Sequence, residues 1–448
     1  MSRQREEKMV EPPALRDHPQ RRILSAEVHA RPYMRLLAPA RASLLALYTE
    51  EEGAEEERRL LTELCRSRGA AGPGEEANFH LVELEDFTLR WERHTEFSTY
   101  GFFAPAEGGG FEHKAIERLP QSWLARLPGE VLCGVHLELQ KATGARPEAE
   151  EVAALLESDT FAACRAAGGA AEVWMNFTIN EDGFGRLLVR DRHLGERQAG
   201  RLVQRLFEIE TYRMMALLAL PLARRHGREL TLIGAQLTSV TEAMAGASVE
   251  AAAGEMPATD GDRQLLEQLT AVAADTQRIA AATAYRFSAA RAYYALVQRR
   301  IEELREERIE GHQTVREFMD RRLSPAMRTC EAVAERIEVL SRQIARTAQL
   351  LRTRIDVQLA AQNRDLLLSM DRRVKLQLIL QETVEGLSVA AITYYSIGLL
   401  SYALSAAEKL GLGVPTKLSA GLAIPLVAGL VWYGIRRVRR RIARWARD

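Results

Sequence analysis

The sequence has no excess of either charge. Its 448 residues include 61 lysines and arginines and 61 aspartates and glutamates, so the formal net charge is zero. A dedicated nucleic-acid binder needs a basic excess to contact phosphates, so we expect no nucleic-acid partner. The opening residues MSRQREEKMV lack the apolar core of a secretory signal peptide, and none is expected.

Motifs of catalysis and cofactor binding are also scarce. The four cysteines show no C-x-x-C spacing, which argues against a zinc site or a disulfide framework and favours reduced thiols. There is no G-x-G-x-x-G motif, no Walker loop and no G-x-S-x-G motif. Spacing indicates no Ser/His/Asp or Cys/His set either. We therefore predict that the chain is not an enzyme and has no cofactor, with a divalent cation as the one ligand left open.

Charge is absent from two long runs near the C-terminus. Residues 387–407 and 418–435 contain no charged side chain. The first run spans a bilayer core of roughly 30 Å as a helix, and the second is near the lower limit of about 17 residues. The tail 436–448 holds seven arginines, and cytoplasmic segments carry the basic excess. We predict a two-helix transmembrane hairpin with the N-terminal domain and the C-terminus both cytoplasmic; the alternative is two buried helices of a soluble protein.

Residues 262–386 are predicted to form a long helical stalk. Apolar residues recur there mostly in steps of three or four, which is the pattern of one apolar stripe on a helix. Ser324-Pro325 predicts a break near 323–326, and the final helix would then run from about Pro325 into the membrane, with roughly 90 Å of it outside the bilayer. Such a helix cannot bury its stripe alone, which implies partner helices from the same chain or from other subunits. We expect a homo-oligomer.

Residues 1–228 read as a cytosolic α/β domain with a mixed sheet, which makes the whole chain α+β. Residues 229–261 read as a connection with a flexible linker over 245–261. Alternation of apolar and polar residues and turn signals predict the strands. The strands are expected within 77–103 and at 131–139, 172–179 and 185–191, and the helices at 35–50, 54–68, 149–157 and 195–226.

Two polar stretches of this domain are candidate ion sites. Glu27 and His29 lie two residues apart, and Glu92, His94 and Glu96 alternate, so on a strand each set shares one face. If the two strands paired, five polar residues would form an electrostatic network or hold a divalent ion. The alternative is a salt-bridged polar sheet face, and a third reading is a membrane-tethered enzyme that uses some of these residues.

Several stretches together resemble a known family. LSAEVHARPY, WERHTEFSTY, RLVQRLFEIETYRMMALLALP and GHQTVREFMDRRLSPAMRTC, followed by ITYYSIGLLSY, are similar to a bacterial family of membrane-anchored proteins of unknown function, domain of unknown function 3422. The resemblance runs from about His18 to Arg437. It implies a place in the bacterial inner membrane and supplies no catalytic residues.

The order of a cytosolic α/β domain, a long helix, a two-span hairpin and a basic tail also resembles the CorA-type divalent-cation transporters. That resemblance implies a pentamer whose first span lines a pore. The Gly-Met-Asn triplet of those proteins is missing, since the region reads SYALSAAEKLGLG. The leading hypothesis is an oligomeric inner-membrane protein that passes or regulates ions, and the alternative is a non-transporting anchored protein that binds or signals.

Three residues are candidates for a pore. Asn363 interrupts the apolar stripe, where a polar residue fixes register, lines a wet channel or is only a solvated gap. Thr393 lies in the first span and would face the pore, although a hydroxyl there also bonds to its own helix backbone. Glu408 would stand at the outer mouth, where a ring of carboxylates attracts cations.

Overall fold

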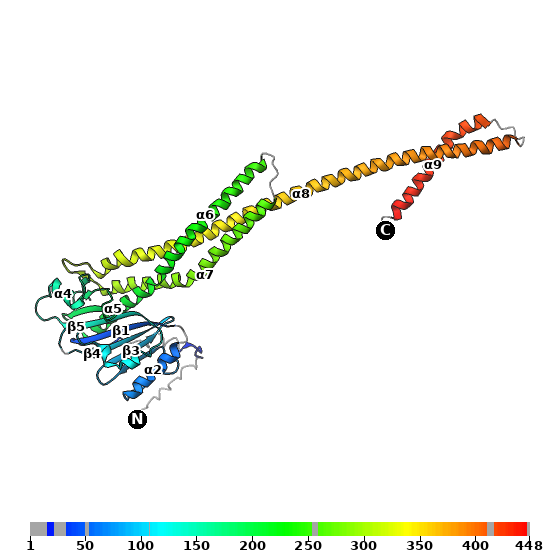
Figure 1. Cartoon of the computed structure of the whole chain (residues 1–448). Helices are drawn as coiled ribbons and strands as arrows, with labels where there is room; N and C mark the ends of the chain where they lie inside the picture. The colour runs from blue at the N-terminus through cyan, green and yellow to red at the C-terminus, as the bar shows by residue number, and fades with distance from the viewer. Residues whose placement is uncertain are drawn as a thin grey trace, which may run out of the picture. The chain divides into compact units, whose positions relative to one another are not determined.

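The computed structural model describes residues 16–21, 33–49, 53–106, 108–252, 259–409 and 416–445. The chain divides into two compact units, residues 1–347 and 348–448 (Figure 1). The first unit contains a mixed β-sheet and the helices that cover it. The second contains the rest of the longest helix and the C-terminal helix.

The sheet has strand order β2-β3-β4-β1-β5-β8-β7-β6-β9. Only β5 and β8 pair in parallel; the other neighbours are antiparallel. The mixed sheet and the α+β class are therefore as predicted. The strands are β1 (Ala40–Tyr48), β2 (Phe79–Glu83), β3 (Thr88–Arg93), β4 (Phe97–Pro105), β5 (Glu130–Lys141), β6 (Ala162–Ala166), β7 (Ala171–Met175), β8 (Gly185–Asp191) and β9 (Glu307–Arg308).

The predicted helix over 35–50 is wrong, because β1 occupies its centre. The segment ARASLLALY is rich in helix formers, but it lies between β4 and β5 and its side chains are buried on both faces. A short, continuously apolar run fits a buried strand as well as a helix. Pairing on both sides of the segment then outweighs its intrinsic preference.

Helices cover both faces of the sheet. Alternate β4 residues point to opposite sides, so Tyr100 and Phe102 join the core under α2, while Phe103 contacts Phe207 of α5 at a ring distance of 6.4 Å. The helices are α2 (Gly53–Ser67), η1 (Ala115–Arg118), α3 (Gln121–Leu124), α4 (Ala149–Leu156), α5 (Glu196–Leu217), α6 (Ala219–Ala252), α7 (Thr259–Leu304), α8 (Val315–Lys409) and α9 (Thr416–Trp445).

The predicted linker over 245–261 is largely helix at its ends. Helix α6 continues to Ala252 and α7 begins at Thr259, while residues 253–258 lie outside the described part of the chain. The sequence ASVEAA is small but rich in alanine, the strongest helix former. The parts of this segment that the structure describes are therefore mainly helical.

Helix α8 begins ten residues before Pro325, where the final helix was expected to start. Its first two backbone amides, of Val315 and Arg316, donate to the Glu306 carboxylate at 3.0 Å each, which satisfies groups that a helix N-terminus leaves open. The predicted break at 323–326 is wrong, because Pro325 lies inside the helix. Leu323 and Met327 are buried on either side of it, and continuous helix keeps both in the core.

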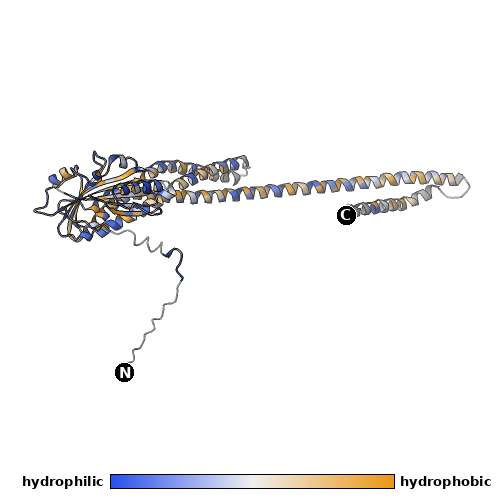
Figure 2. Cartoon of the chain, turned by 90° about the horizontal axis from the view of Figure 1, so that it is seen from below, coloured by the Kyte–Doolittle hydropathy of each residue, from blue (hydrophilic) through white to orange (hydrophobic). Residues whose placement is uncertain are grey.

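The described residues include two helices that are long and apolar enough to cross a membrane. One is α8, which contains such a stretch within Val315–Ala406, and the other is α9 over Gly421–Val438. Both stretches are almost entirely unburied in the chain. Hydrophobic residues recur among hydrophilic ones along the length of α8 (Figure 2).

Gly200 of α5 can be used to test how the segment before β1 packs against this helix. A Cβ atom at this position would lie 1.7 Å from the Met34 carbonyl oxygen, and the Leu36 amide donates to the Glu196 carbonyl nearby at 3.1 Å. We predict that Gly200→Ala destabilises the protein by about 1–3 kcal/mol or more, because the backbone must move to admit the methyl group. Thermal unfolding of the detergent-solubilised full chain measures the loss.

Gly227→Ala in α6 is the matched control. Its Cβ would meet Val333 at an ordinary 3.5 Å, and alanine is the better helix former by up to about 1 kcal/mol. Equal stability of the two variants would show that the segment carrying Met34 does not pack against α5 as described.

Candidate functional site

The first candidate pair, Glu27 and His29, lies outside the described residues. The second set is described, but not as predicted. Glu92 is in β3, His94 follows the strand, and Glu96 precedes β4 in the turn that the His94 amide closes onto the Phe97 carbonyl at 2.8 Å. The expectation that these three side chains share one strand face is therefore wrong, since the chain reverses among them.

Glu92 and His94 line a small cavity between the sheet and α5. The Glu92 carboxylate accepts from Arg90 at 2.8 Å and lies 3.8 Å from His94 Nε2. The His94 ring stacks on Phe97 with centroids 4.2 Å apart. The cavity volume is about 30 Å³, which is room for a water or two. Because Arg90 neutralises Glu92, this pair is poorly suited to a divalent cation.

Glu96 is held by side chains of α7. Arg286 forms an ion pair with it, and Tyr293 donates to Glu96 Oε1 at 2.9 Å. Tyr285 donates at 3.4 Å from the other side, and Arg286 also donates to the Tyr48 hydroxyl at 3.3 Å. Burial and the hydrogen bond to Glu96 raise the pKa of Tyr293. These contacts join the β3–β4 turn to α7 and give Glu96 a structural role.

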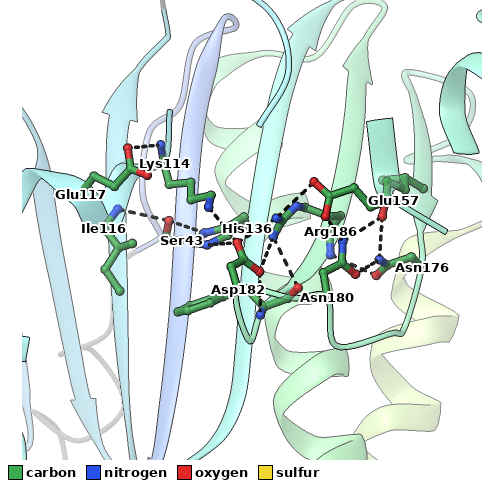
Figure 3. A network of polar contacts seen from close by, with 12 residues as sticks. Ser43, Lys114, Ile116, Glu117, His136, Glu157, Asn176, Asn180, Asp182 and Arg186 are labelled. Atoms are coloured by element: carbon green, nitrogen blue, oxygen red, sulfur yellow. Dashed lines mark hydrogen bonds and ion pairs between the residues drawn. The ribbon is translucent and has the colours of Figure 1, made fainter. Parts of the chain in front are cut away.

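The fold creates one arrangement that spacing could not indicate. Ser43 of β1 and His136 of β5 lie opposite each other in the sheet register, and Asp182 approaches from the loop before β8 (Figure 3). Ser43 Oγ is 2.8 Å from His136 Nδ1, and His136 Nε2 is 3.7 Å from Asp182 Oδ2. These are the residue types of a hydrolytic triad, drawn from positions 93 and 46 residues apart.

This group is closed to substrate. Ser43 is 0% exposed and His136 is 2% exposed, and a nucleophile must reach the atom it attacks. Ser43 Oγ accepts the Ile116 amide hydrogen at 3.2 Å and shares a second hydrogen bond with His136 Nδ1. The Ser43 hydroxyl and His136 Nδ1 thereby pair inside the sheet, whereas His136 Nε2 is buried with no hydrogen-bond partner among the described residues.

Asp182 is fixed by cations rather than by the histidine. Lys114 and Arg186 each approach its Oδ2 atom at 2.8 Å, and the Phe184 amide donates to Oδ1 at 3.1 Å (Figure 3). Burial alone would raise the pKa of Asp182, but these hydrogen bonds outweigh it and hold that pKa well below its usual range. Asp182, in the turn before β8, therefore anchors a polar network that includes Lys114 and Arg186.

In the part of the chain that the structure describes, no group of three or more His, Cys, Asp or Glu side chains is placed to hold a metal ion. The four cysteines are buried and free, as expected for reduced thiols. Burial raises the pKa of Cys133 and Cys164, which makes both poor nucleophiles and poor metal ligands.

The pore candidates all lie in the second unit. Asn363 is exposed on α8. Thr393 is 8% exposed, and its hydroxyl donates to the Val389 carbonyl at 2.7 Å, the backbone bond that was the alternative to a pore-facing role. Glu408 is in the last turn of α8, and its side chain lies outside the described residues.

His136 should make stability depend on pH. Burial, with Arg186 adding to it, lowers the pKa of His136 from 6.5 to about 3. Between these values the unfolded chain binds a proton that the folded protein does not. Stability is therefore complete above about pH 6.5 and falls as the pH is lowered toward 3, by up to ~1.4 kcal/mol per pH unit.

We predict that His136→Asn, which keeps a polar atom near the Ser43 hydroxyl, flattens this slope between pH 6 and pH 4.5. Thermal unfolding across that range measures it, with His113→Asn at an exposed position as the control. An unchanged slope in the His136 variant would mean that the buried imidazole is charged in the folded protein.

Comparisons with known proteins give a family. No curated protein matches the chain. The solved structure of the full-length CmaX protein covers 68% of this chain and 89% of its own length at 15% identity, and its TM-score of 0.17 is too low to support a shared fold. The model of the family described as "Protein of unknown function (DUF3422)" matches residues 16–442. The chain therefore belongs to this family of unknown function, as its motifs predict.

Proposed function

We propose that the chain is a homo-oligomeric membrane protein whose copies associate along α8. The observation that supports this is the apolar surface of the α8 segment 348–386 and the first residue of the span. Leu351 is buried and Ile355 is partly buried, but the other large apolar side chains of this segment have exposed fractions from 47% to 74%. They are Leu350, Val357, Leu359, Leu366, Leu367, Leu368, Met370, Val374, Leu376, Leu378, Ile379, Leu380, Val384 and Leu387.

The free energy gained by burying these side chains is large compared with the stability of an isolated helix. Burying a leucine or valine side chain contributes roughly 1.5–3 kcal/mol, and monomeric soluble proteins rarely leave contiguous apolar surface of this extent uncovered. A lone helix in water gains little from propensity alone. Association with the same segment of other copies covers the apolar residues.

The charges of this segment permit such contact. Residues 348–386 contain six lysines and arginines and five aspartates and glutamates, so parallel copies meet without strong mutual repulsion. Apolar residues lie on more than one side of the helix, which suits contact with more than one neighbour. An assembly larger than a dimer, such as the pentamer of the CorA-type proteins, fits this distribution.

We place the assembly in the bacterial inner membrane, with the sheet domain and the arginine-rich tail on the cytoplasmic side and no enzymatic role. In this orientation Glu408 of each copy stands at the outer end of the first span, where a ring of carboxylates would draw cations. We infer that cations pass along the shared axis, or that the assembly regulates their passage.

A second candidate function is a non-transporting anchor that holds several copies of the sheet domain at the membrane. The Thr393 hydroxyl favours it, because this group bonds to its own helix backbone and lies on a covered face. The two candidates share the oligomer and differ in whether ions cross.

Oligomer mass is the first test. The native mass of the full chain in detergent should be at least twice the 50.1 kDa of one chain. Leu366→Arg should shift it toward the monomer, because a charge then enters the apolar contact. Leu366→Met keeps an apolar side chain of similar volume at the same position and should leave the mass unchanged. A monomeric wild-type protein would overturn the proposal.

Cation flux is the second test. Full-length protein in liposomes should carry mono- or divalent cations faster than empty vesicles. Glu408→Gln should lower that flux by roughly tenfold at low ionic strength, whereas Glu382→Gln, which precedes the first span, should not. If the oligomer forms but its flux does not exceed that of empty vesicles, ion transport is rejected. The non-transporting anchor then becomes the proposed function.

A further inference from the structure

Three tyrosines of the first span are placed where tyrosine is costly. Tyr394, Tyr395 and Tyr402 are 76%, 72% and 80% exposed in the single chain. Ile397 is the middle residue of the uncharged run 387–407, so Tyr394 and Tyr395 lie within roughly 5 Å of the middle along the helix axis. Membrane tyrosines usually sit at the bilayer surface, where the hydroxyl reaches water.

The three hydroxyls have no hydrogen-bond partner within the described part of the chain. Tyr394 and Tyr395 contact each other only through their rings, with centroids 5.8 Å apart and planes at 76°. Thr393 differs, since its short side chain bonds to the helix backbone. A hydroxyl left unpaired in hydrocarbon costs roughly 1–3 kcal/mol or more.

The tyrosines continue a face of α8 that is exposed outside the membrane as well. Leu380, Val384, Leu387, Ala391, Tyr395, Gly398 and Tyr402 follow one another in steps of three or four residues. Such steps place them on one side of a helix. Gly398 stands between the two tyrosines of this row, and a Cβ atom there would meet nothing within 4 Å. A small residue in a span lets another helix approach closely.

The opposite side of the same span is more covered. Thr393 is buried, and Ile397, Leu400 and Leu404 are partly buried, along one side in steps of three or four. The side that carries the hydroxyl groups is therefore the uncovered one. We call the four residues Tyr394, Tyr395, Gly398 and Tyr402 the tyrosine face.

We propose that the tyrosine face is the contact between copies of this chain inside the membrane. A phenol both donates and accepts a hydrogen bond, so identical hydroxyls around a symmetry axis satisfy one another, each donating to the next copy and accepting from the previous one. Parallel copies bring these groups to the same depth, and the contact continues the apolar surface of residues 348–386. This inference rests on the proposed oligomer and places phenol oxygens, not Thr393 Oγ1, nearest the shared axis.

Cysteine cross-linking tests the face directly. Tyr402→Cys and Ala403→Cys differ by one residue in depth and by about 100° around the helix, and both positions are exposed. On oxidation of the full chain in membranes, Tyr402→Cys should form disulfide-linked dimers at least roughly fivefold faster, because a disulfide needs Cβ atoms about 3.5–4.5 Å apart. The unmodified protein, with its four cysteines buried, is the blank.

Tyrosine-to-phenylalanine variants test the hydroxyls with little change of shape. Tyr395→Phe or Tyr402→Phe should weaken self-association by about 3- to 10-fold each, the range of interhelical hydrogen bonds in membranes. Tyr433→Phe is the control, since Tyr433 is exposed on α9 two residues before the end of its uncharged run, where water satisfies the hydroxyl.

The outcomes separate this inference from the proposed oligomer. An oligomer in which Tyr402→Cys cross-links no faster than Ala403→Cys overturns the tyrosine face and leaves the association along α8 in place. Phenylalanine variants that associate as tightly as wild type overturn the hydrogen-bonded contact. A wild-type monomer overturns both proposals.

Discussion

The constraint on which the rest depends is the apolar surface of α8. Most buried residues of the first unit find partners in the same chain: α2 and α5 cover the two faces of the sheet, and Glu306 receives the first amides of α8. Beyond Thr347 the same helix continues, and most of its large apolar side chains there are about half exposed or more. The chain supplies a long helix and leaves its surface to be covered by something else, which is why we propose association with other copies.

In the first unit, by contrast, several buried polar groups have their partners within the same chain. Glu96 is enclosed by Arg286 and two tyrosine hydroxyls, and Glu57 accepts from Ser98 at 2.6 Å and Trp91 at 3.0 Å. Removing one partner of such a buried pair costs about 3–5 kcal/mol, so these networks fix how the strands and helices meet. The Ser43, His136 and Asp182 group belongs with them. Its residue types suggest hydrolysis, but its burial and the Ile116 amide give the serine a structural bond.

The sequence predicted the elements whose structure follows from local composition and periodicity. It did not predict those that depend on tertiary contacts. The two uncharged runs, α2, α4 and most of the strands follow from composition and periodicity. β1 was mistaken for a helix because ARASLLALY acquires its strand geometry from neighbours on both sides. Pro325 was mistaken for a helix end because the buried Leu323 and Met327 hold the helix together across it. Ser43, His136 and Asp182 come together only through strand pairing, so their spacing in the sequence does not reveal them.

The chain reversal between Glu92 and Glu96 was missed because no glycine or proline marks that turn.

The difference between threonine and tyrosine in the first span follows from side-chain length. A threonine hydroxyl lies one bond from Cβ and reaches the carbonyl four residues earlier, as Thr393 does with Val389. A phenol oxygen lies at the far end of a rigid ring and cannot turn back to its own backbone. In the proposed membrane span, the hydroxyl-bearing residues near the middle that need an outside partner are therefore the tyrosines. Thr393 was the candidate because it is small and polar, yet those same properties let its own helix satisfy it. A tyrosine at the same depth has its hydroxyl satisfied only by another helix or by water held between helices.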